Sequence, residues 1–334
     1  MRVFLTGGTG LLGSHVAQTL RDGGHEVVAL FRSGAEVGFL RALGCELVEG
    51  SVTDPSGVQS LRMGRCSALV HAAAMMYGAE SFGASEAVNV DGTRRVLEGA
   101  RDAGVTQAVH ISSVAVYGDQ PGPITEDLPL EWPLRIQDYY ARTKRAAEQV
   151  ARGIHAEGRV GVTVLRPPAL YGERDRWLIP QLIALVKGVF VPLPGGGRTR
   201  FPAVYAGNVA QAVELALWGR GSGGVFNITD ESGTTLRRLF EGLAGELALR
   251  PRFVTIPAAL ARTGAGFAEA LGLRISGARD LSLKRTVRLA SEDNPYSSGK
   301  AMTVLGWSPH FTLEEALSRT GAWIREREGS NDSR

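Results

Sequence analysis

The chain has 334 residues, of which 44% are hydrophobic and 21% charged, a composition typical of a compact globular protein that excludes an extensively disordered chain. Its net charge is +3, but no run of basic residues is interleaved with aromatic residues, so nucleic acid is not an expected partner. Cys45 and Cys66 fit no metal-ligand spacing, so we expect reduced thiols, no metal site and a cytoplasmic protein.

The chain alternates short apolar strands with helices. Val3–Leu5 predicts a strand, the spacing of Leu12, Val16 and Leu20 predicts a helix, and His25–Leu30 predicts a second strand that is buried on both faces. Further helices are expected near 37–43, 85–103, 138–153, 257–273 and 314–327, and further strands at 46–49, 68–71, 108–112 and 162–166. This alternation is typical of an α/β fold with a doubly wound parallel sheet.

After about residue 167 the alternation loosens, and proline and glycine clusters interrupt the pattern. We expect residues 1–167, with returning segments near 201–228, to form the main domain. Residues 168–200 and 229–328 are expected to form a smaller C-terminal substrate-binding lobe. The last residues, 329–334, are expected to be frayed, as chain ends often are.

One helix of the predicted lobe has a notable apolar face. In the segment 257–274, Leu260, Phe267 and Leu271 share one side of the helix. The segment is a candidate lid or membrane-touching helix, and ordinary packing against the lobe is the alternative. No apolar segment of the sequence is long and unbroken enough to span a bilayer, so peripheral contact is the one membrane interaction left open.

A glycine-rich segment stands where the first predicted strand turns into the first helix. Because glycine has no Cβ, the backbone there can approach a pyrophosphate, whose charge then lies at the amides and dipole of the helix N-terminus. Glycines at 7, 10 and 13 in this position predict a dinucleotide-binding site of the Rossmann type. The expected binding residues are Gly7, Gly8, Thr9, Gly10, Leu11, Leu12 and Gly13.

The end of the second predicted strand bears on which dinucleotide binds. An acidic residue there would accept hydrogen bonds from the ribose of NAD, whereas an arginine accommodates the 2′-phosphate of NADP. The chain has Leu30–Ser33 at this point, with no carboxylate and with Arg32. NADP is therefore the expected cofactor and NAD the alternative, and a strand-end arginine that is merely solvated would leave the choice open.

Tyr140 and Lys144 are four residues apart, so a helix places the phenol and the amine on one face. A nearby ammonium is expected to lower the pKa of the phenol and let Tyr140 exchange a proton with a substrate. Ser112 and Ser113 end a predicted strand at the sheet edge where ligands bind, so a serine hydroxyl there is placed to hold a substrate oxygen. Asn89 is either a relay through water to Lys144 or a helix-interior asparagine satisfied by the backbone.

The order and spacing of these motifs resemble the extended short-chain dehydrogenases, including their epimerase and 3β-hydroxysteroid dehydrogenase branches. The resemblance covers nearly the whole chain and also rests on these segments: His71–Ala74, Asn89–Thr93, Val116–Gly118, Arg166-Pro167, Tyr171-Gly172, Tyr296–Ala301 and Leu305–Pro309. It implies that Ser113, rather than Ser112, is catalytic. It also implies that Tyr140 and Lys144 contact the cofactor, with Lys144 on the nicotinamide ribose.

The same resemblance extends the expected cofactor site. The additional residues are Ser51, Val52, His71, Ala72, Ala73 and Pro167. Ser51 departs from the family pattern, because many members carry an aspartate there that touches adenine. The resemblance further implies a homodimer through the helices near 90–103 and 138–153.

The residues expected near the substrate are mostly apolar, and each has packing in the core as its alternative. Together with Ser113 they are Met75, Tyr77, Trp132, Ala169, Trp177 and Phe201. Such a lining suits a small apolar molecule, a lipid or steroid, better than a sugar diphosphate. Many epimerases also have an asparagine shortly after the arginine of the sixth strand, where this chain has Pro167-Pro168-Ala169.

The expected function is therefore that of an NAD(P)-dependent oxidoreductase that interconverts a secondary alcohol and a ketone. The segments 171–182 and 204–210 resemble the 3β-hydroxysteroid dehydrogenase branch, which implies a 3β-hydroxysteroid, a sterol or a β-keto acid as substrate. A nucleotide-sugar epimerase or dehydratase that uses bound NAD is the alternative enzyme. A protein that senses NADP without turnover is the alternative from another class.

Overall fold

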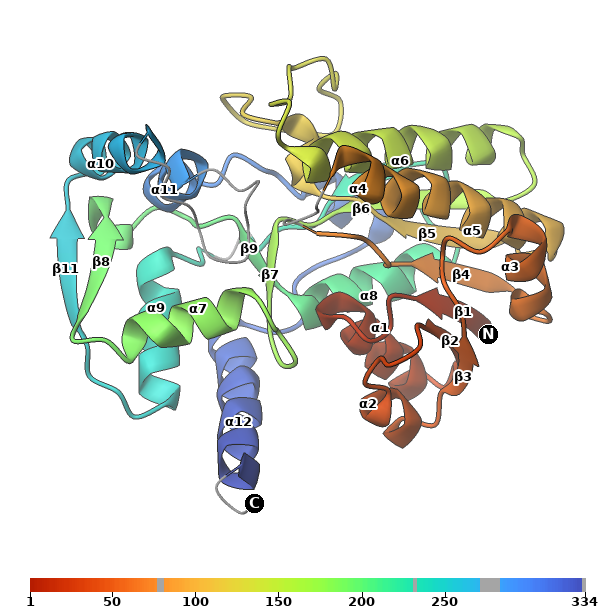
Figure 1. Cartoon of the computed structure of the whole chain (residues 1–334), viewed down its shortest axis with the longest axis horizontal. Helices are drawn as coiled ribbons and strands as arrows, with labels where there is room; N and C mark the ends of the chain where they lie inside the picture. Colours follow the sequence, from red (N-terminus) through yellow and green to blue (C-terminus); the bar gives the residue numbers. More distant parts are fainter. Residues whose placement is uncertain (77–80, 231–232, 271–282, 332–334) are drawn as a thin grey trace.

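The computed structural model describes residues 1–76, 81–230, 233–270 and 283–331. Its largest element is a seven-stranded parallel sheet with the strand order β10-β6-β5-β4-β1-β2-β3 (Figure 1). The strands are β1 (Arg2–Thr6), β2 (Glu26–Phe31), β3 (Glu46–Glu49), β4 (Ala68–His71), β5 (Gln107–Ile111), β6 (Gly161–Arg166) and β10 (Val225–Asn227). The order reverses at β1, so β1 and β4 flank the crevice where such sheets bind ligands.

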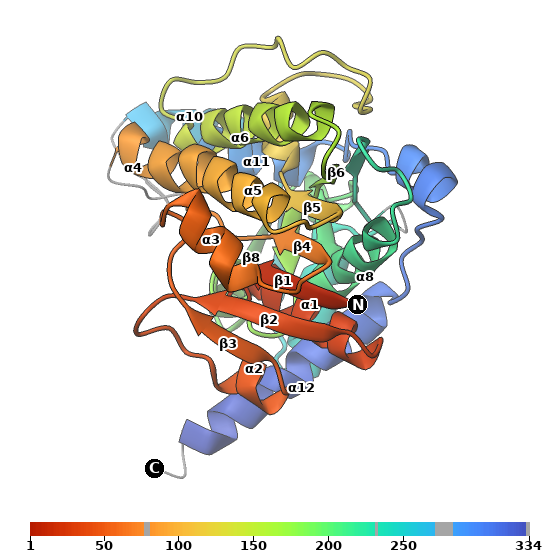
Figure 2. The ribbon, with the colours of Figure 1, turned by 90° about the vertical axis from the view of Figure 1, so that its right-hand side faces the viewer.

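Helices cover both faces of this sheet (Figure 2). The first layer contains α3 (Ser56–Met63), α4 (Phe82–Glu86), α5 (Gly92–Asp102) and α6 (Tyr139–Ala156), and the second contains α1 (Leu11–Asp22), α2 (Gly38–Ala42) and α8 (Ala206–Leu217). Successive side chains of β1 divide between the two cores, with Phe4 packed toward α3 and α5 and with Val3 and Leu5 packed toward α1 and α8. The predicted doubly wound parallel sheet is confirmed, and β2 is buried on both faces as expected, with Val27 and Ala29 in one core and Val28 and Leu30 in the other.

Two local features differ from the sequence prediction. Helix α3 was not predicted, because its buried residues are Gln59 and Met63 and the segment shows no apolar stripe at helical spacing. The helix expected near 85–103 is divided into α4, the π-helical segment η1 (Ala87–Asp91) and α5. A π-helical turn inserted in an α-helix often marks a functional position, and here it contains Asn89.

A second hydrophobic core lies beside the main sheet, between helices and two short parallel strand pairs (Figure 1). The helices are α7 (Leu178–Val186), α9 (Leu236–Glu246) and α12 (Leu313–Asn331), and the strand pairs are β8 (Phe190–Pro194) with β11 (Arg252–Ile256) and β7 (Ala169–Tyr171) with β9 (Ala203–Tyr205). The predicted division into two domains stays a prediction. One segment of the expected lobe, however, packs into the core of the main sheet through Ala301, Leu305 and Trp307.

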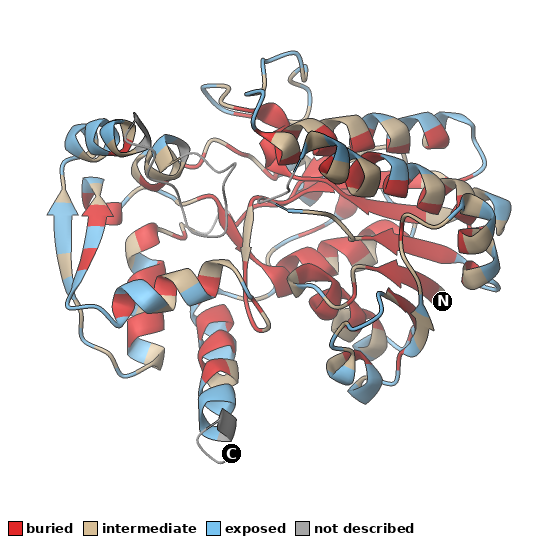
Figure 3. Cartoon of the chain, in the orientation of Figure 1, coloured by how far each residue is buried: buried red, intermediate tan, exposed pale blue. Residues whose placement is uncertain are grey.

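The outer part of the second lobe contains α10 (Ala258–Ala270) and α11 (Leu283–Ser291). Leu260 and Phe267 on α10 are 63% and 70% exposed, so these two side chains do not pack against the lobe. Much of the helix is coloured as exposed in Figure 3. Leu271 lies outside the described residues. Whether this helix is a lid or touches a membrane stays a prediction. Among the helices that the structure describes, none is long and apolar enough to cross a bilayer.

Helix α12 is longer than expected. It continues to Asn331, so the expectation of a frayed end is wrong for residues 329–331. Residues 332–334 lie outside the described part of the chain.

Candidate active site

The glycine segment forms a tight turn between β1 and α1. Gly7 has a φ of 76°, which favours glycine, and its carbonyl oxygen accepts a hydrogen bond of 3.0 Å from the Gly10 amide. A Cβ at Gly13 would overlap the Gly7 carbonyl group, and a Cβ at Gly7 would lie 2.6 Å from the Ala73 amide nitrogen. Helix α1 has neither a side-chain cap nor an acidic residue in its first turn. Its amides therefore suit a phosphate group, and the cradle fits a dinucleotide.

The tightness of this turn gives a testable result. Gly13→Ala is expected to raise the dissociation constant for a nicotinamide dinucleotide at least tenfold, or to lower the unfolding free energy by more than about 2 kcal/mol, because the new methyl group meets backbone atoms. Calorimetric titration and urea unfolding measure the two effects. Gly57→Ala in α3 is the matched control, since nothing lies within 4 Å of the added Cβ, and it should change neither quantity unfavourably. An unchanged Gly13→Ala protein would contradict the close approach.

The alanines that follow β4 lie directly against the glycine turn. The Ala72 amide donates to the Thr6 carbonyl at 3.2 Å, and the Ala73 amide donates to the Thr6 hydroxyl at 3.3 Å. The His71 ring is fully buried, and its two nitrogens lie 2.8 Å from the Thr6 hydroxyl and 2.9 Å from the Thr93 hydroxyl. The His71 side chain therefore joins β1 to α5, so any contact of His71 with the cofactor would come from its backbone.

Several other predicted cofactor residues have defined local roles. Leu12 packs into the core on the α1 side of the sheet, which leaves its amide and not its side chain for a ligand. The Ser51 hydroxyl lies 2.7 Å from the Thr53 hydroxyl, and the Ser51 amide donates to the Asp54 carboxylate at 2.9 Å. Arg32 is exposed just after β2, and no described acidic residue forms an ion pair with it. Its charge is therefore available to a ligand.

Tyr140 and Ser113 form the centre of the candidate site. Ser113 caps the short 3₁₀ helix η2 (Val114–Tyr117), where its hydroxyl accepts a hydrogen bond of 3.2 Å from the Ala115 amide. The same hydroxyl is hydrogen-bonded to the phenol of Tyr140, in the first turn of α6. The structure thus brings together two residues that the sequence placed on separate elements, at the edge of the sheet that also carries the glycine turn.

The acidity of Tyr140 differs from the expectation. Burial raises the pKa of Tyr140 to about 12, and the hydrogen bond from Ser113 offsets only part of that rise. The predicted lowering by Lys144 is wrong for this structure, because the Lys144 ammonium donates instead to the Ile111 carbonyl at 2.7 Å. The buried amine is itself affected, since burial lowers the pKa of Lys144 to about 8. Tyr140 is thus a protonated phenol at neutral pH.

The Asn89 side chain is hydrogen-bonded to the backbone of the segment that follows β4. Its side-chain oxygen accepts from the Met75 amide at 2.7 Å, and its amide group donates to the Met75 carbonyl at 2.9 Å and to the Thr143 hydroxyl at 2.9 Å. The amide thus has both backbone and side-chain partners. The relay through water to Lys144 stays a prediction.

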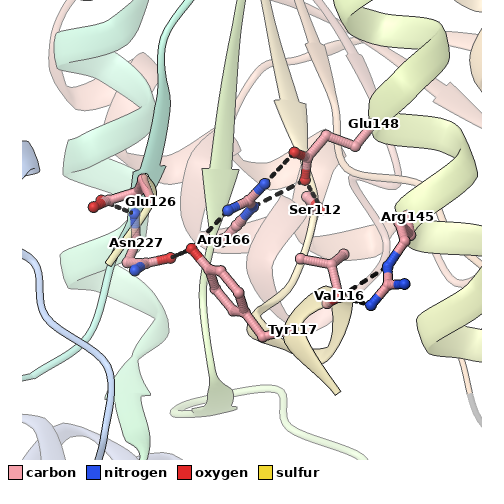
Figure 4. Close-up of polar contacts among 8 residues, drawn as sticks. All are labelled: Ser112, Val116, Tyr117, Glu126, Arg145, Glu148, Arg166 and Asn227. Atoms are coloured by element: carbon pink, nitrogen blue, oxygen red, sulfur yellow. Dashed lines mark hydrogen bonds and ion pairs between the residues drawn. The ribbon is translucent and has the colours of Figure 1, made fainter. Parts of the chain in front are cut away.

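A buried carboxylate, Glu148, was missed by the sequence analysis and links two residues that were named there, Ser112 and Arg166 (Figure 4). Glu148 lies on α6 one turn beyond Lys144, and it accepts hydrogen bonds from the Ser112 hydroxyl and from the Arg166 guanidinium. A carboxylate four residues after Lys144 was the available signal, because Tyr140, Lys144 and Glu148 share one helix face. Since Ser112 is bound to Glu148, Ser113 is the serine that is free to face Tyr140.

The predicted substrate residues are only partly brought together. Ala169 and Phe201 are neighbours, because β7 pairs with β9 and the Ala169 amide donates to the Pro202 carbonyl. Trp132 lies elsewhere, beside Gly118, with 42% of its surface exposed. Trp177 lies at the N-terminus of α7. Tyr77 lies outside the described residues.

A cavity of about 450 Å³ adjoins the segment that follows Ser113–Tyr117, and its lining was not predicted. Its wall includes Gly118–Pro123, and two ion pairs cross it, Arg288 with Asp119 at 2.7 Å and Arg200 with Asp293. Proline and glycine in 118–123 were the available sequence signal for an irregular loop shortly after Ser113.

Comparison with known proteins identifies the family. The model of the NAD dependent epimerase/dehydratase family matches residues 3–229. The chain belongs to this family. It is therefore an enzyme of an NAD-dependent family with the extended short-chain dehydrogenase fold. The glycine turn and the spacing of Tyr140 and Lys144 had indicated this family.

Relatives of this family member include both reductases and dehydrogenases. The chain is 31% identical to the 4-hydroxy-2-methyl-3-oxo-4-farnesyl-3,4-dihydroquinoline-1-oxide ketoreductase of Stigmatella aurantiaca, with 95% of each chain covered. It is 27% identical to the decarboxylating sterol-4-alpha-carboxylate 3-dehydrogenase of Candida albicans, with 97% of each covered. The solved UDP-glucose 4-epimerase of Thermotoga maritima superimposes with a TM-score of 0.75 at 25% identity, covering 98% of this chain and 100% of that one.

Proposed function

We propose that this enzyme interconverts a secondary alcohol and a ketone on a hydrophobic substrate, with NADP as its preferred cofactor. The observation that supports this most directly is the hydrogen bond between Ser113 and Tyr140, buried at the same edge of the sheet as the glycine turn. The ketoreductase and sterol dehydrogenase relatives support the apolar substrate class, such as a 3β-hydroxysteroid, a sterol or a β-keto acid.

The side chains divide the chemistry among them. A bound nicotinamide dinucleotide supplies or accepts the hydride. Ser113 holds the substrate oxygen, and Tyr140 donates a proton to that oxygen during reduction or removes it during oxidation. Because burial raises the pKa of Tyr140 to about 12, the phenol is ready to donate at neutral pH, which favours reduction. Oxidation needs the deprotonated phenol, so its rate should rise as the pH increases.

A spectrophotometric screen tests the proposal. Sterols, β-keto acids and UDP-sugars would each be incubated with NADPH and with NADH, and reduced-cofactor absorbance would be followed. The proposal expects consumption in a one-to-one ratio with an apolar ketone. Conversion of a UDP-sugar without net absorbance change would favour the epimerase, which the likeness to UDP-glucose 4-epimerase keeps as the second candidate. Cofactor binding without any turnover would favour a sensor and overturn the proposal.

Arg32 supports the preference for NADP, because its guanidinium is exposed after β2 and no described carboxylate pairs with it. Arg32→Asp is expected to lower the ratio of kcat/KM with NADPH to that with NADH by about 10- to 100-fold, since a carboxylate repels the 2′-phosphate and accepts from a ribose hydroxyl. Arg65→Asp, an equal change of charge at another exposed arginine, is the control and should leave the ratio unchanged. An unchanged ratio in Arg32→Asp would remove Arg32 from the phosphate site.

The assembly and location of the enzyme also belong to this proposal. The resemblance to extended short-chain dehydrogenases supports a homodimer formed through α5 and α6, which lie in the same helical layer. Light scattering of the purified chain would test this. The cytoplasmic location stays a prediction.

A further inference from the structure

Three turns of α6 are attached to three consecutive residues at the end of β5. Each contact joins one residue of the helix to one residue of the strand end: Tyr140 with Ser113, Lys144 with Ile111, and Glu148 with Ser112. The first contact joins the two residues of the proposed reaction, and the second holds the amine that is expected to bind the nicotinamide ribose. The third contact involves Glu148, which has no role in the proposed reaction. It holds Ser112, the residue next to Ser113.

Glu148 is itself held by Arg166 at the end of β6 (Figure 4). The Arg166 Nε donates to Glu148 Oε2 at 3.0 Å, and Arg166 Nη2 donates to Glu148 Oε1. The two side chains are 1% and 2% exposed. A two-point contact of this kind fixes the orientation of the carboxylate as well as its distance.

The same guanidinium also holds the other end of the serine segment. Arg166 Nη1 donates to the Tyr117 hydroxyl at 2.6 Å, and that hydroxyl donates to the Asn227 side-chain oxygen at 2.9 Å (Figure 4). Ser112 precedes Ser113 and Tyr117 ends its 3₁₀ turn. One ion pair therefore fixes the backbone on both sides of Ser113.

Stability alone does not explain this pair. Moving two charges out of water costs several kcal/mol per ion, and apolar residues of similar volume are often equally or more stabilising. We propose that Glu148 and Arg166 are positioning residues for the reaction, which hold Ser113 against Tyr140 and place a fixed negative charge beside Lys144. This inference rests on the function proposed above for Ser113 and Tyr140 and on the expected contact of Lys144 with the nicotinamide ribose.

The charges around Lys144 support the second part of the proposal. His71 on β4 and His110 on β5 face the amine, and burial, followed by the Lys144 charge, lowers the pKa of both imidazoles, that of His71 to about 3. Both rings are thus neutral near pH 7. Tyr140 is protonated at that pH, so Glu148 supplies the countercharge, and it raises the pKa of Lys144 against the effect of burial.

The first experiment follows Lys144 directly, without substrate. The chain has four lysines, so lysine labelled with ¹³C at Cε gives four NMR signals, and Lys144→Met assigns the one of interest. The wild-type midpoint is expected near pH 8. In Glu148→Gln the midpoint should fall by about one pH unit, because the neutral amide no longer favours the ammonium. Glu157→Gln, a substitution of the exposed carboxylate at the end of α6, is the matched control and should leave the midpoint unchanged.

The second experiment follows turnover of the apolar ketone that the screen identifies. Glu148→Gln is expected to lower kcat about tenfold with less than a twofold change in KM, because the substrate still binds while Ser113 and Tyr140 lose their alignment. Ser112→Ala removes only the hydroxyl that binds Glu148 and should lower kcat about threefold. Arg166→Lys keeps the charge but loses the two-point contact, so it should resemble Glu148→Gln in kcat and not in the Lys144 midpoint.

The outcomes separate the two proposals. A folded Glu148→Gln protein with wild-type kcat and an unmoved Lys144 midpoint overturns the positioning role, whatever the substrate proves to be. A shifted midpoint in a protein without dehydrogenase activity supports the electrostatic part and contradicts the proposed function instead. Should Glu148→Gln not fold, the double variant Glu148→Gln/Arg166→Met, which leaves no unpaired buried charge, is measured in its place. Ser112→Ala is the mildest of these changes, and an unaltered kcat in this variant would also contradict the proposal.

Discussion

Tyr140→Phe is expected to lower kcat for the proposed alcohol–ketone interconversion by about 10²- to 10⁴-fold, the usual contribution of a positioned proton donor. The substitution removes only the hydroxyl, while the ring, 8% exposed, keeps its packing between Ala115 and Ala141. The dissociation constant for NADPH should therefore change less than about twofold, because the glycine turn is untouched. Initial rates and calorimetric titration measure the two quantities.

Tyr139→Phe is the matched control for this experiment. Tyr139 is the neighbouring residue of α6 and its ring contacts Phe82 with the centroids 5.8 Å apart, so the same chemical change is made away from Ser113. It should leave kcat near the wild-type value. Equal losses of kcat and of cofactor affinity in Tyr140→Phe would show that the phenol serves binding and not proton transfer.

Those parts of the site that depend on local sequence could be predicted. The glycine turn is defined by seven adjacent residues, and both the positive φ of Gly7 and the close approach of Gly13 to the Gly7 carbonyl arise within that segment. The Tyr140–Lys144 pair follows from helical periodicity alone. Ser113 could be placed beside them because parallel strands end at one edge of a sheet, which the strand order of the structure confirms.

The partners of each side chain could not be predicted in the same way. Spacing showed that Lys144 shares a face with Tyr140, but not that the ammonium donates to the Ile111 carbonyl on a neighbouring element. The pKa of Tyr140 was predicted in the wrong direction for a related reason. Its sign depends on how completely the ring is buried, which is a property of tertiary packing and not of the four-residue spacing.

The residues expected near the substrate show even more clearly that tertiary contacts do not follow from sequence periodicity. Ala169 and Phe201 meet because β7 pairs with β9, a pairing that the irregular second half of the sequence did not indicate. The cavity beside Gly118–Pro123 is bounded by residues more than 150 positions later in the chain, among them Arg288. Loops that meet across such separations carry no periodic signal.

Lys144→Met should abolish most of the activity, with kcat lower by about 10²-fold or more, because it removes the amine that the family resemblance leads us to expect on the nicotinamide ribose. Its effect on stability should depend on pH. The pKa of Lys144 is about 8 in the folded chain, below the value of about 10.4 for a free lysine. Below pH 8 both states carry the proton, so the cost of burying the charge is present in full. Between pH 8 and 10.4 the folded state has lost the proton and the unfolded state keeps it, so that cost disappears as the pH rises.

Wild type is therefore expected to gain about 2 kcal/mol of unfolding free energy relative to Lys144→Met when the pH is raised from about 7 to about 10. Urea unfolding of both proteins at intermediate pH values measures this difference, and the constant loss of the hydrogen bond to Ile111 cancels from its slope. Lys187→Met is the control, because Lys187 is 53% exposed and its removal should give no such slope. If the unfolding free energies of wild type and Lys144→Met change in parallel with pH, the pKa of Lys144 is the same in the folded and the unfolded chain. The Lys144 amine would then be charged and solvated, which contradicts a buried ammonium beside Glu148.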